Sequence, residues 1–387
     1  MKTMLALIAA GSVFGTVAIA QSPPRYQITD LGTLAGGTFS LAERGNTDNG
    51  LVAGVSSGPG GALHATVWYK GQILDIANTG LGGPNSWTLD VNERGQAAGV
   101  AETSASDDEN FCAFFSGFQC LPFVWQIGVM AELPTLGGPN GGVSAISIRG
   151  EMAGVAQTSV VDPSCIAPIR HQFQAVKWNA TGEIHELLPL PGDTVGFGFW
   201  MNDSGQVVGT SGSCANTQPI GVVVGPHAVL WEQDGSAREL PSLGGTVNTS
   251  LIAVGNRAIA INNGGQIVGG SALSDNTTAH AVLWPDKSSI LDLGTLPGDF
   301  NSAALAINDK GDIVGVSNDT SGGLRPFLWQ DGVMHDLNEL VPADSPMYLL
   351  FAAGIDSRGE IAGWGVVKST GEVHAFLATP AQGTAAK

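Results

Sequence analysis

A pentapeptide that ends in tryptophan recurs along this chain, and it constrains the fold more than any other feature. The six full copies are HATVW (64–68), LPFVW (121–125), QAVKW (174–178), HAVLW (227–231), HAVLW (280–284) and RPFLW (325–329). A seventh copy, HAFLA (374–378), carries alanine in place of the tryptophan. Successive copies begin 45 to 57 residues apart. A spacing of this length indicates a repeat architecture in which each copy belongs to one structural unit.

Two other elements recur in step with the pentapeptide. The first is an N-x-x-G turn followed by small or β-branched residues, with clear copies at 92–99, 202–209, 262–269 and 308–315 and looser copies at 47–54, 147–154 and 356–363. The second is an acidic-leucine pair that opens a loop rich in glycine and proline, with clear copies at 30–37, 132–139, 239–245 and 292–299 and weaker copies from 75, 186 and 336. Asn and Gly in this arrangement indicate a tight turn between paired strands.

Each unit is therefore predicted to contain four short strands, which we call A to D in chain order. In the sixth unit they cover 303–307, 312–317, 325–329 and 333–337. Four-stranded units of this length fit the blades of a propeller and are too long for one coil of a β-helix. We predict an all-β fold, a seven-bladed β-propeller of four-stranded blades.

The two ends of the repeat region predict how the ring closes. The last unit stops after its C strand at 374–380, whereas the first unit is preceded by an orphan strand at 26–31. Pairing of these two strands would complete the seventh blade and leave no open edge between the first and last blades. The propeller is therefore predicted to cover residues 25–380 as one domain, with a short linker at 21–24 and a tail at 381–387.

Residues 1–20 have the pattern of a secretory signal peptide. Lys2 precedes an apolar run over 4–20 that ends in Ala-Ile-Ala, the small-x-small pattern that a signal peptidase recognises. A retained membrane anchor is the alternative, but the apolar stretch is short, interrupted by glycine and followed by Gln-Ser-Pro-Pro. We expect a secreted or periplasmic protein that has no membrane contact after cleavage.

The composition limits the partners of the chain. With 34 acidic and 16 basic residues, the formal net charge is −18, which opposes binding to a phosphate backbone. The 43% content of hydrophobic residues excludes a disordered chain, and the 55 glycines largely follow the repeated turns. Nucleic acid is therefore excluded as a partner, and we expect a monomer.

The repeat elements also resemble those of a known family. The His-Ala-Phe triplet at 374–376, its variants at His64, His227 and His280, and the DLGTL and N-D-x-G elements are similar to the HAF-repeat family of bacterial extracellular proteins. The second unit departs from the pattern with Leu-Pro-Phe and the third with Gln-Ala-Val. The resemblance covers nearly all of the chain after residue 20. It implies export and a repeat β architecture, and it carries no established activity.

Three adjacent units carry long insertions between strands B and C, at about 102–120, 157–173 and 211–226. These insertions would rise on one side of the propeller face that also bears the D-to-A connections. Long loops on a rigid scaffold are where binding residues concentrate, so this rim is a candidate site. The alternative, which we weigh about equally, is surface decoration that the fold tolerates.

All four cysteines of the chain lie in these insertions. Export into an oxidising compartment favours disulfides, and four cysteines allow three pairings. We predict Cys112 with Cys120 as a staple within one loop, and Cys165 with Cys214 as a clasp between adjacent blades. A metal site is disfavoured because the sequence has no C-x-x-C and no histidine pair near the cysteines.

The insertions also supply the candidate binding residues. His171, beside Arg170, is the one histidine that breaks the repeat pattern, whereas four others occupy one repeat position and suggest a structural role. The acidic run Asp107, Asp108 and Glu109 offers hard oxygen ligands for Ca²⁺. It lacks a D-x-D-x-D-G loop, and such runs are more often solvated loop tips.

The inner A strands carry a second set of candidates. Trp87 and Trp200 would lie there, where they plug the central channel or stack on a ligand. Asp90 is a polar residue in the same strands, and it could line a channel mouth together with Glu43, Arg44 and Arg257.

Two functions are compatible with these features. The sequence has no H-E-x-x-H or GxxxxGK[ST] motif, and no catalytic residue and no cofactor is indicated. The nearly regular repetition favours an exported, non-enzymatic propeller that binds an extracellular glycan, surface polymer or protein through its loop-rich face. The alternative is a secreted polysaccharide hydrolase or lyase with its site at the central channel mouth.

Overall fold

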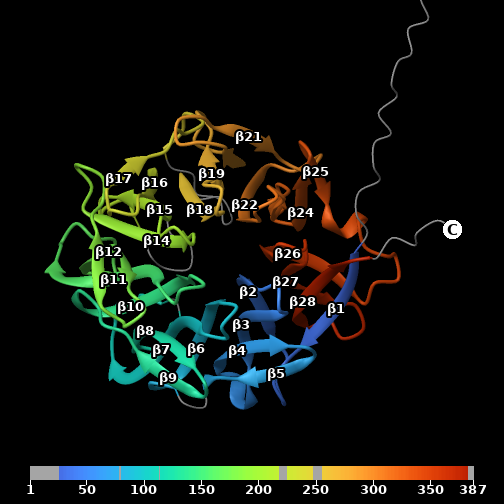
Figure 1. Cartoon of the computed structure of the whole chain (residues 1–387), viewed down its shortest axis with the longest axis horizontal. Coiled ribbons are helices and arrows are strands. Elements are labelled where there is room, and N and C mark those ends of the chain that lie inside the picture. Colours follow the sequence, from blue (N-terminus) through green and yellow to red (C-terminus); the bar gives the residue numbers. More distant parts are fainter. Residues whose placement is uncertain (1–25, 78–79, 113, 218–224, 247–254, 382–387) are drawn as a thin grey trace, which may run out of the picture.

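The computed structural model describes residues 26–77, 80–112, 114–217, 225–246 and 255–381. The predicted signal peptide and linker lie outside these residues. The described chain forms seven four-stranded antiparallel sheets arranged as a ring, and the sequence runs once around it (Figure 1). The predicted seven-bladed β-propeller is therefore confirmed. Among the described residues, no helix reaches the length and apolar character that a membrane crossing needs.

The first three blades contain strands β2 to β13. Blade 1 consists of β2 (Ser40–Asn46), β3 (Leu51–Ser57), β4 (Leu63–Tyr69) and β5 (Gln72–Asp75), with the short 3₁₀ helix η1 (Pro59–Gly61) between β3 and β4. Blade 2 consists of β6 (Gly82–Val91), β7 (Ala97–Ser106), β8 (Phe118–Gln126) and β9 (Val129–Glu132). Blade 3 consists of β10 (Gly137–Ile146), β11 (Met152–Val161), β12 (His171–Trp178) and β13 (Ile184–Leu187).

The remaining blades contain strands β14 to β28 and β1. Blade 4 consists of β14 (Val195–Met201), β15 (Val207–Gly212), β16 (His227–Trp231) and β17 (Ala237–Glu239). Blade 5 consists of β18 (Arg257–Ile261), β19 (Ile267–Ala272), β20 (Ala279–Trp284) and β21 (Leu291–Gly294). Blade 6 consists of β22 (Asn301–Ile307), β23 (Ile313–Asn318), β24 (Leu324–Gln330) and β25 (Val333–Asp336), followed by the 3₁₀ helix η3 (Leu337–Glu339). Blade 7 consists of β26 (Met347–Ile355), β27 (Ile361–Val367), β28 (Val373–Pro380) and β1 (Tyr26–Gly32).

The ring closes as the sequence predicts. Strand β1 pairs antiparallel with β28, and the register runs from Tyr26 opposite Pro380 to Asp30 opposite Phe376. In Figure 1 the first strand, in blue, lies beside the last strand, in red. The seventh blade is thus built from both ends of the described chain.

The turns between strands A and B link each blade to the next. The glycine at the fourth position of every such turn has a positive φ, for example 87° at Gly311, which glycine adopts without steric cost. In blades 2, 4, 5 and 6 the first residue is an asparagine whose amide donates to a main-chain carbonyl of the following blade. Asn262, for example, donates to the Asn308 carbonyl at 3.0 Å. The repeated asparagine therefore holds neighbouring blades together as well as forming a turn.

The tryptophans of the C strands pack between blades. Trp178, Trp231 and Trp284 are fully buried, and each indole N–H donates to a carbonyl of the preceding blade. The acceptors are Pro134 at 2.9 Å, Leu188 at 2.7 Å and Pro241 at 2.8 Å, which lie at or just after the repeated acidic-leucine pair. Two of the three repeat elements thus meet at each of these blade interfaces.

Candidate functional site

The predicted insertions of blades 2 and 3 are partly extensions of the blades themselves. Strands β7 and β11 each have ten residues, and they continue past the ends predicted for strand B. The extension pairs Ser106 with Phe118 in blade 2 and Val161 with His171 in blade 3. The insertions therefore rise as two-stranded ribbons from the face that bears the B-to-C connections.

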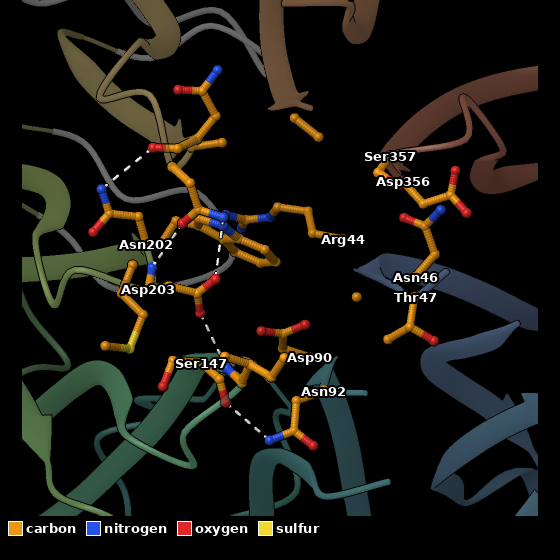
Figure 2. Close-up of a pocket in the computed structure, with 18 of the residues that line it drawn as sticks. Arg44, Asn46, Thr47, Asp90, Asn92, Ser147, Asn202, Asp203, Asp356 and Ser357 are labelled. Carbon is orange, nitrogen blue, oxygen red and sulfur yellow. Dashed lines mark hydrogen bonds between the residues drawn. The ribbon is translucent and has the colours of Figure 1, made fainter. Parts of the chain in front are cut away.

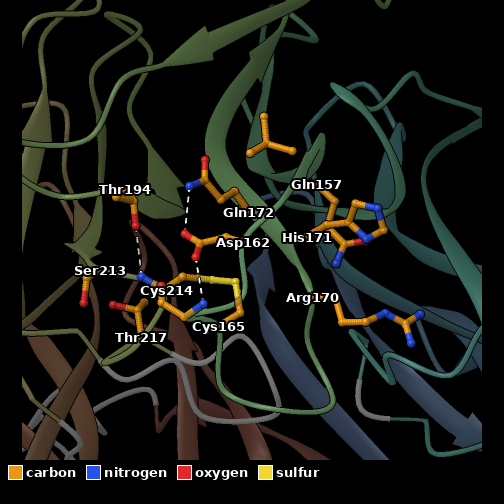
Figure 3. Close-up of a disulfide and its surroundings, with 12 residues drawn as sticks. Gln157, Asp162, Cys165, Arg170, His171, Gln172, Thr194, Ser213, Cys214 and Thr217 are labelled. Atoms are coloured by element: carbon orange, nitrogen blue, oxygen red, sulfur yellow. Dashed lines mark hydrogen bonds between the residues drawn. A yellow bond between two sulfur atoms is a disulfide. The ribbon is translucent and has the colours of Figure 1, made fainter.

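Two disulfides fix these insertions, and both predicted pairings are confirmed. Cys112 is bonded to Cys120 within blade 2. Cys165 of blade 3 is bonded to Cys214 of blade 4, across 49 residues of sequence (Figure 3). A main-chain hydrogen bond from Ile166 to the Cys214 carbonyl accompanies the second bond. Blades 3 and 4 are thus joined covalently at this rim.

A buried carboxylate joins the insertions of blades 2 and 3. The Glu109 side chain is fully buried, and its Oε1 lies 2.5 Å from Nδ1 of His171. Its Oε2 accepts from the Gln157 amide at 2.8 Å and from the main-chain N–H groups of Arg170 and His171. Burial would raise the pKa of Glu109, but these hydrogen bonds outweigh it and hold the pKa below its usual range.

The other two residues of the acidic run lie at the surface of the same contact. Asp108 makes a bidentate ion pair with the exposed guanidinium of Arg170, at 3.0 and 2.5 Å. Asp107 accepts from the Glu109 main chain and from the Asn140 amide. The structure therefore brings together five predicted site residues, which are Asp107, Asp108, Glu109, Arg170 and His171.

An open groove borders this cluster. It has a volume of about 680 Å³ and is lined by Ser106, Asp107, Asp108, Asn110, Phe115, Ser116, Gly117 and Arg170. Phe115 is 70% exposed. Asn110 and Phe115 both have positive φ values, of 51° and 55°, a conformation that costs energy for residues other than glycine. The sequence analysis did not single out Phe115, because residue type alone does not show which side chains of a loop face solvent.

Among the described residues, one group of three side chains lies close enough together to share a metal ion. This group does not include Asp107, Asp108 or Glu109. The group is Asp162, Cys165 and Cys214. Its two sulfur atoms are already bonded to each other, so they are not thiolate ligands. Calcium binding by residues 107–109 stays a prediction of the sequence alone.

Two of the remaining predicted site residues, Asp90 and Trp200, lie on the opposite side of the molecule, around the central channel. Trp87 does not line this cavity and packs instead against the apolar cluster that contains Cys120 and Cys214. A cavity of about 320 Å³ opens among the A-to-B turns of the blades (Figure 2). Arg44 of β2 reaches across it, and its guanidinium contacts the carbonyls of Phe199 and Ile259 in blades 4 and 5 at 3.5 and 3.4 Å. The ring of Trp200 lies 5.9 Å from the same guanidinium. The predicted polar channel mouth is thus crossed by one arginine.

Two carboxyl groups of the inner strands have raised pKa values, and of these Asp90 lines the cavity whereas Glu43 does not. Burial raises the pKa of Asp90 to about 7, against the lowering effect of main-chain N–H donors from Ile146 and Val91. Burial likewise raises the pKa of Glu43 to about 7, although Arg44 and the Trp87 indole lower it. Burial and the nearby Arg44 lower the pKa of Arg257 to about 10. Both oxygens of Asp90 are engaged by main-chain donors, so its carboxylate also links blades 2 and 3.

The repeated histidines each pair with the repeated acidic residue of the adjacent strand. The Nδ1 atoms of His64, His227, His280 and His374 lie 2.8 to 2.9 Å from the carboxylates of Asp75, Glu239, Asp292 and Asp30. In blade 6, Arg325 takes the histidine position and pairs with Asp336. The sequence predicted a structural role for these histidines, and the structure adds their partners.

Comparisons with known proteins identify the fold of this chain through similarity in structure. The search of protein families and the search of curated proteins both found no match. The β-propeller domain of the Trilobed protease from Pyrococcus furiosus is similar in structure, with a TM-score of 0.52, 10% sequence identity, and coverage of 89% of this chain and 96% of that domain. Virginiamycin B lyase from Staphylococcus aureus has a TM-score of 0.48 at 10% identity, with 92% and 99% covered. The Trilobed protease domain is described as having an open velcro topology, whereas this chain closes its ring by pairing β1 with β28.

Proposed function

We propose that this chain is an exported, non-enzymatic β-propeller that binds an extracellular glycan through the groove beside Phe115. The observation that carries the proposal is the exposed ring of Phe115 in a groove lined by hydroxyl, amide, carboxylate and guanidinium groups. An exposed aromatic face with polar groups around it is the surface that stacks on a sugar ring and bonds its hydroxyls. Membership of the HAF-repeat family belongs to this proposal and agrees with export.

The rigidity of the groove supports a binding role. Its walls are held by the Cys112–Cys120 disulfide and by the buried contacts of Glu109. A groove that is fixed before the ligand arrives loses less conformational entropy on binding. The two disulfides also support export, because such bonds persist mainly in oxidising compartments.

The test is retention of the purified mature protein on a panel of immobilised polysaccharides, with soluble products measured in parallel. We expect retention on at least one polymer without release of reducing or unsaturated ends. Phe115→Ala should reduce retention at least about tenfold, in the range that loss of one aromatic stacking contact produces. Arg170→Ala should reduce it less, because Asp108 and Ser116 remain in the groove.

Ile127→Ala is the matched control. Ile127 is 88% exposed in the turn between β8 and β9, on the opposite face from the groove. Its replacement removes a comparable exposed hydrophobic group, so retention should not change. If both variants lose retention equally, the groove is not the binding site. If retention is seen only on immobilised proteins, the ligand is a protein and the glycan proposal is wrong.

The alternative, a hydrolase or lyase at the channel mouth, has one observation in its favour. Asp90 and Glu43 have pKa values of about 7, where a carboxyl group can both donate and accept a proton in neutral solution. Release of reducing or unsaturated ends that disappears in Asp90→Asn, but persists in Phe115→Ala, would favour this alternative over binding alone.

A further inference from the structure

A further cleft lies between blades 1 and 2, and it shares no lining residue with the groove or the channel cavity. This cleft has a volume of about 290 Å³. His64 of β4 lies on the blade 1 side, and Asn85, Ser86 and Glu102 lie on the blade 2 side. The volume is at the lower limit of small-molecule sites, so the cleft can hold a ligand of about one sugar ring.

Glu102 is the unusual residue of the cleft. It occupies the third position after the glycine that ends each N-x-x-G element. The corresponding residues of the other blades are Ser57, Gln157, Gly212, Ala272, Asn318 and Val366. Only blade 2 therefore has a carboxylate here. His64 is the second residue of β4 in blade 1, so this cleft combines a repeat histidine with that carboxylate of the next blade.

Blade 3 shows that the charge of Glu102 is not needed for the fold. Glu102 accepts from the main-chain N–H and the side-chain amide of Asn85, at 3.0 and 2.8 Å. Gln157 accepts the equivalent pair of bonds from Asn140, at 3.1 and 2.9 Å. An amide at this position thus holds the neighbouring A strand as well as a carboxylate does.

The charge of Glu102 has no cationic partner among the described residues. The side chain is 1% exposed, and its bonded donors are Asn85 and the hydroxyl of Ser116, all of them neutral. A carboxylate has about four acceptor positions, and three are used. A buried carboxylate without a counter-charge is costly unless a cation joins it.

The histidine across the cleft offers a second acceptor. Nδ1 of His64 lies 2.8 Å from the Asp75 carboxylate, and the side chain is 26% exposed. When Nδ1 carries the hydrogen of this contact, Nε2 is left as an acceptor. Both walls then present acceptors to a ligand that is rich in donors. His64, Asp75 and Glu102 do not form one of the groups of the described residues that are close enough to share a metal ion.

We propose that the cleft between blades 1 and 2 binds a small molecule with a primary ammonium group, of the hexosamine class. The ammonium group is the counter-charge of Glu102, and His64 accepts a hydrogen bond from a second donor of the ligand. The residues that line this cleft differ from those that line the glycan groove proposed above, although Ser116 of the groove donates to Glu102.

The test compares glucosamine with glucose, which share size and ring shape and differ in the ammonium group. Calorimetric titration of the purified mature protein should show glucosamine binding at least about tenfold more tightly than glucose. Glu102→Gln should remove this preference while the unfolding temperature stays that of the parent, as Gln157 predicts. His64→Gln should weaken glucosamine binding several-fold. Added salt should weaken it as well.

Phe115→Ala is the control that separates the two sites, and it should leave glucosamine binding unchanged. The proposal is overturned if glucose and glucosamine bind equally, or if neither binds at about 20 mM, well above the millimolar range expected of so small a ligand. It is also overturned if a stably folded Glu102→Gln protein keeps the preference. Retention of polymers by the Glu102→Gln protein would leave the glycan groove intact in each of these cases.

Discussion

His171 and Glu109 bind each other across the boundary between blades 2 and 3, through the imidazole Nδ1 and a fully buried carboxylate oxygen. Three further donors from blade 3 converge on the other oxygen of the same carboxylate. At the rim on which we place the binding groove, the buried side chain of Glu109 therefore connects the insertions of blades 2 and 3.

Replacing this carboxylate should loosen the rim. Glu109→Gln puts an amide nitrogen against groups that already donate, so we expect the free energy of unfolding to fall by about 2–3 kcal/mol. Chemical denaturation monitored by tryptophan fluorescence measures the change. Asp108→Asn, which affects only an exposed ion pair of the same run, should have a much smaller effect. Equal losses in the two variants would contradict the buried role of Glu109.

The same contact predicts sensitivity to acid. The pKa of Glu109 is lowered in the folded protein, so its contribution is fully present above the pKa of an unfolded glutamate, about 4.3. The contribution is lost as the pH falls from there through the folded pKa. Denaturation between pH 3 and pH 6 should show this loss in the parent protein and a weaker loss in Glu109→Gln.

The channel predicts the opposite trend at higher pH. The pKa values of Asp90 and Glu43 are raised to about 7, so the folded protein binds more protons than the unfolded chain between about pH 4 and pH 7. Stability should therefore fall as the pH rises through this range, by up to about 1.4 kcal/mol per pH unit for each carboxyl group. Asp90→Asn should reduce the slope of the free energy of unfolding against pH by the contribution of one carboxyl group. A parent protein whose stability is flat from pH 4 to pH 7 would contradict the buried titration.

The two disulfides should differ in their effect on stability. The Cys165–Cys214 bond spans 49 residues and the Cys112–Cys120 bond spans eight. In the loop-entropy model these spans correspond to about 4 and about 2.5 kcal/mol. The Cys165→Ser, Cys214→Ser double variant should therefore unfold at lower denaturant than the Cys112→Ser, Cys120→Ser variant. A peptide map without reduction checks both linkages, and any other pairing contradicts the structure.

The interface tryptophans give a prediction for blade packing. Trp231 is fully buried and donates to the Leu188 carbonyl of the preceding blade at 2.7 Å. Trp231→Phe removes this bond and part of the packed volume, so we expect a loss of about 1–2 kcal/mol in denaturant unfolding. Trp329 is only half-buried, and Trp329→Phe should cost less. A larger loss in Trp329→Phe would show that the buried indole bond contributes little.

The sequence predicted the blades well because their signals are local. A tight turn, an alternating strand and a period near 50 residues are all visible within one unit, and they suffice for strand number, strand order and ring closure. The amide of Asn262 was read only as a turn signal, since its bond to Asn308 joins different units. A contact between units can be recognised only when the positions of neighbouring blades in the ring are known.

The candidate site was predicted only in part, for the same reason. The insertions, the disulfide pairs and the cluster around Arg170 followed from residue type and from the places where the repeat is interrupted. The exposure of Phe115 did not, because exposure depends on which side of the rim the loop turns. Glu102 was taken as the start of an insertion, yet it is the sixth residue of β7, and its place in the cleft can be recognised only when blade 1 lies beside it.

The pairing of β1 with β28 makes one of the first strands to be synthesised depend on one of the last. Synthesis produces β1 first and β28 last, and the contact between Asp30 and His374 joins residues 344 positions apart. Until the final strand exists, β1 has an unpaired edge that invites wrong partners and proteolysis. A chain that stops early cannot hide this edge, however well its earlier blades have folded. The order of β1 thus depends on β28, a strand that is made about 340 residues later.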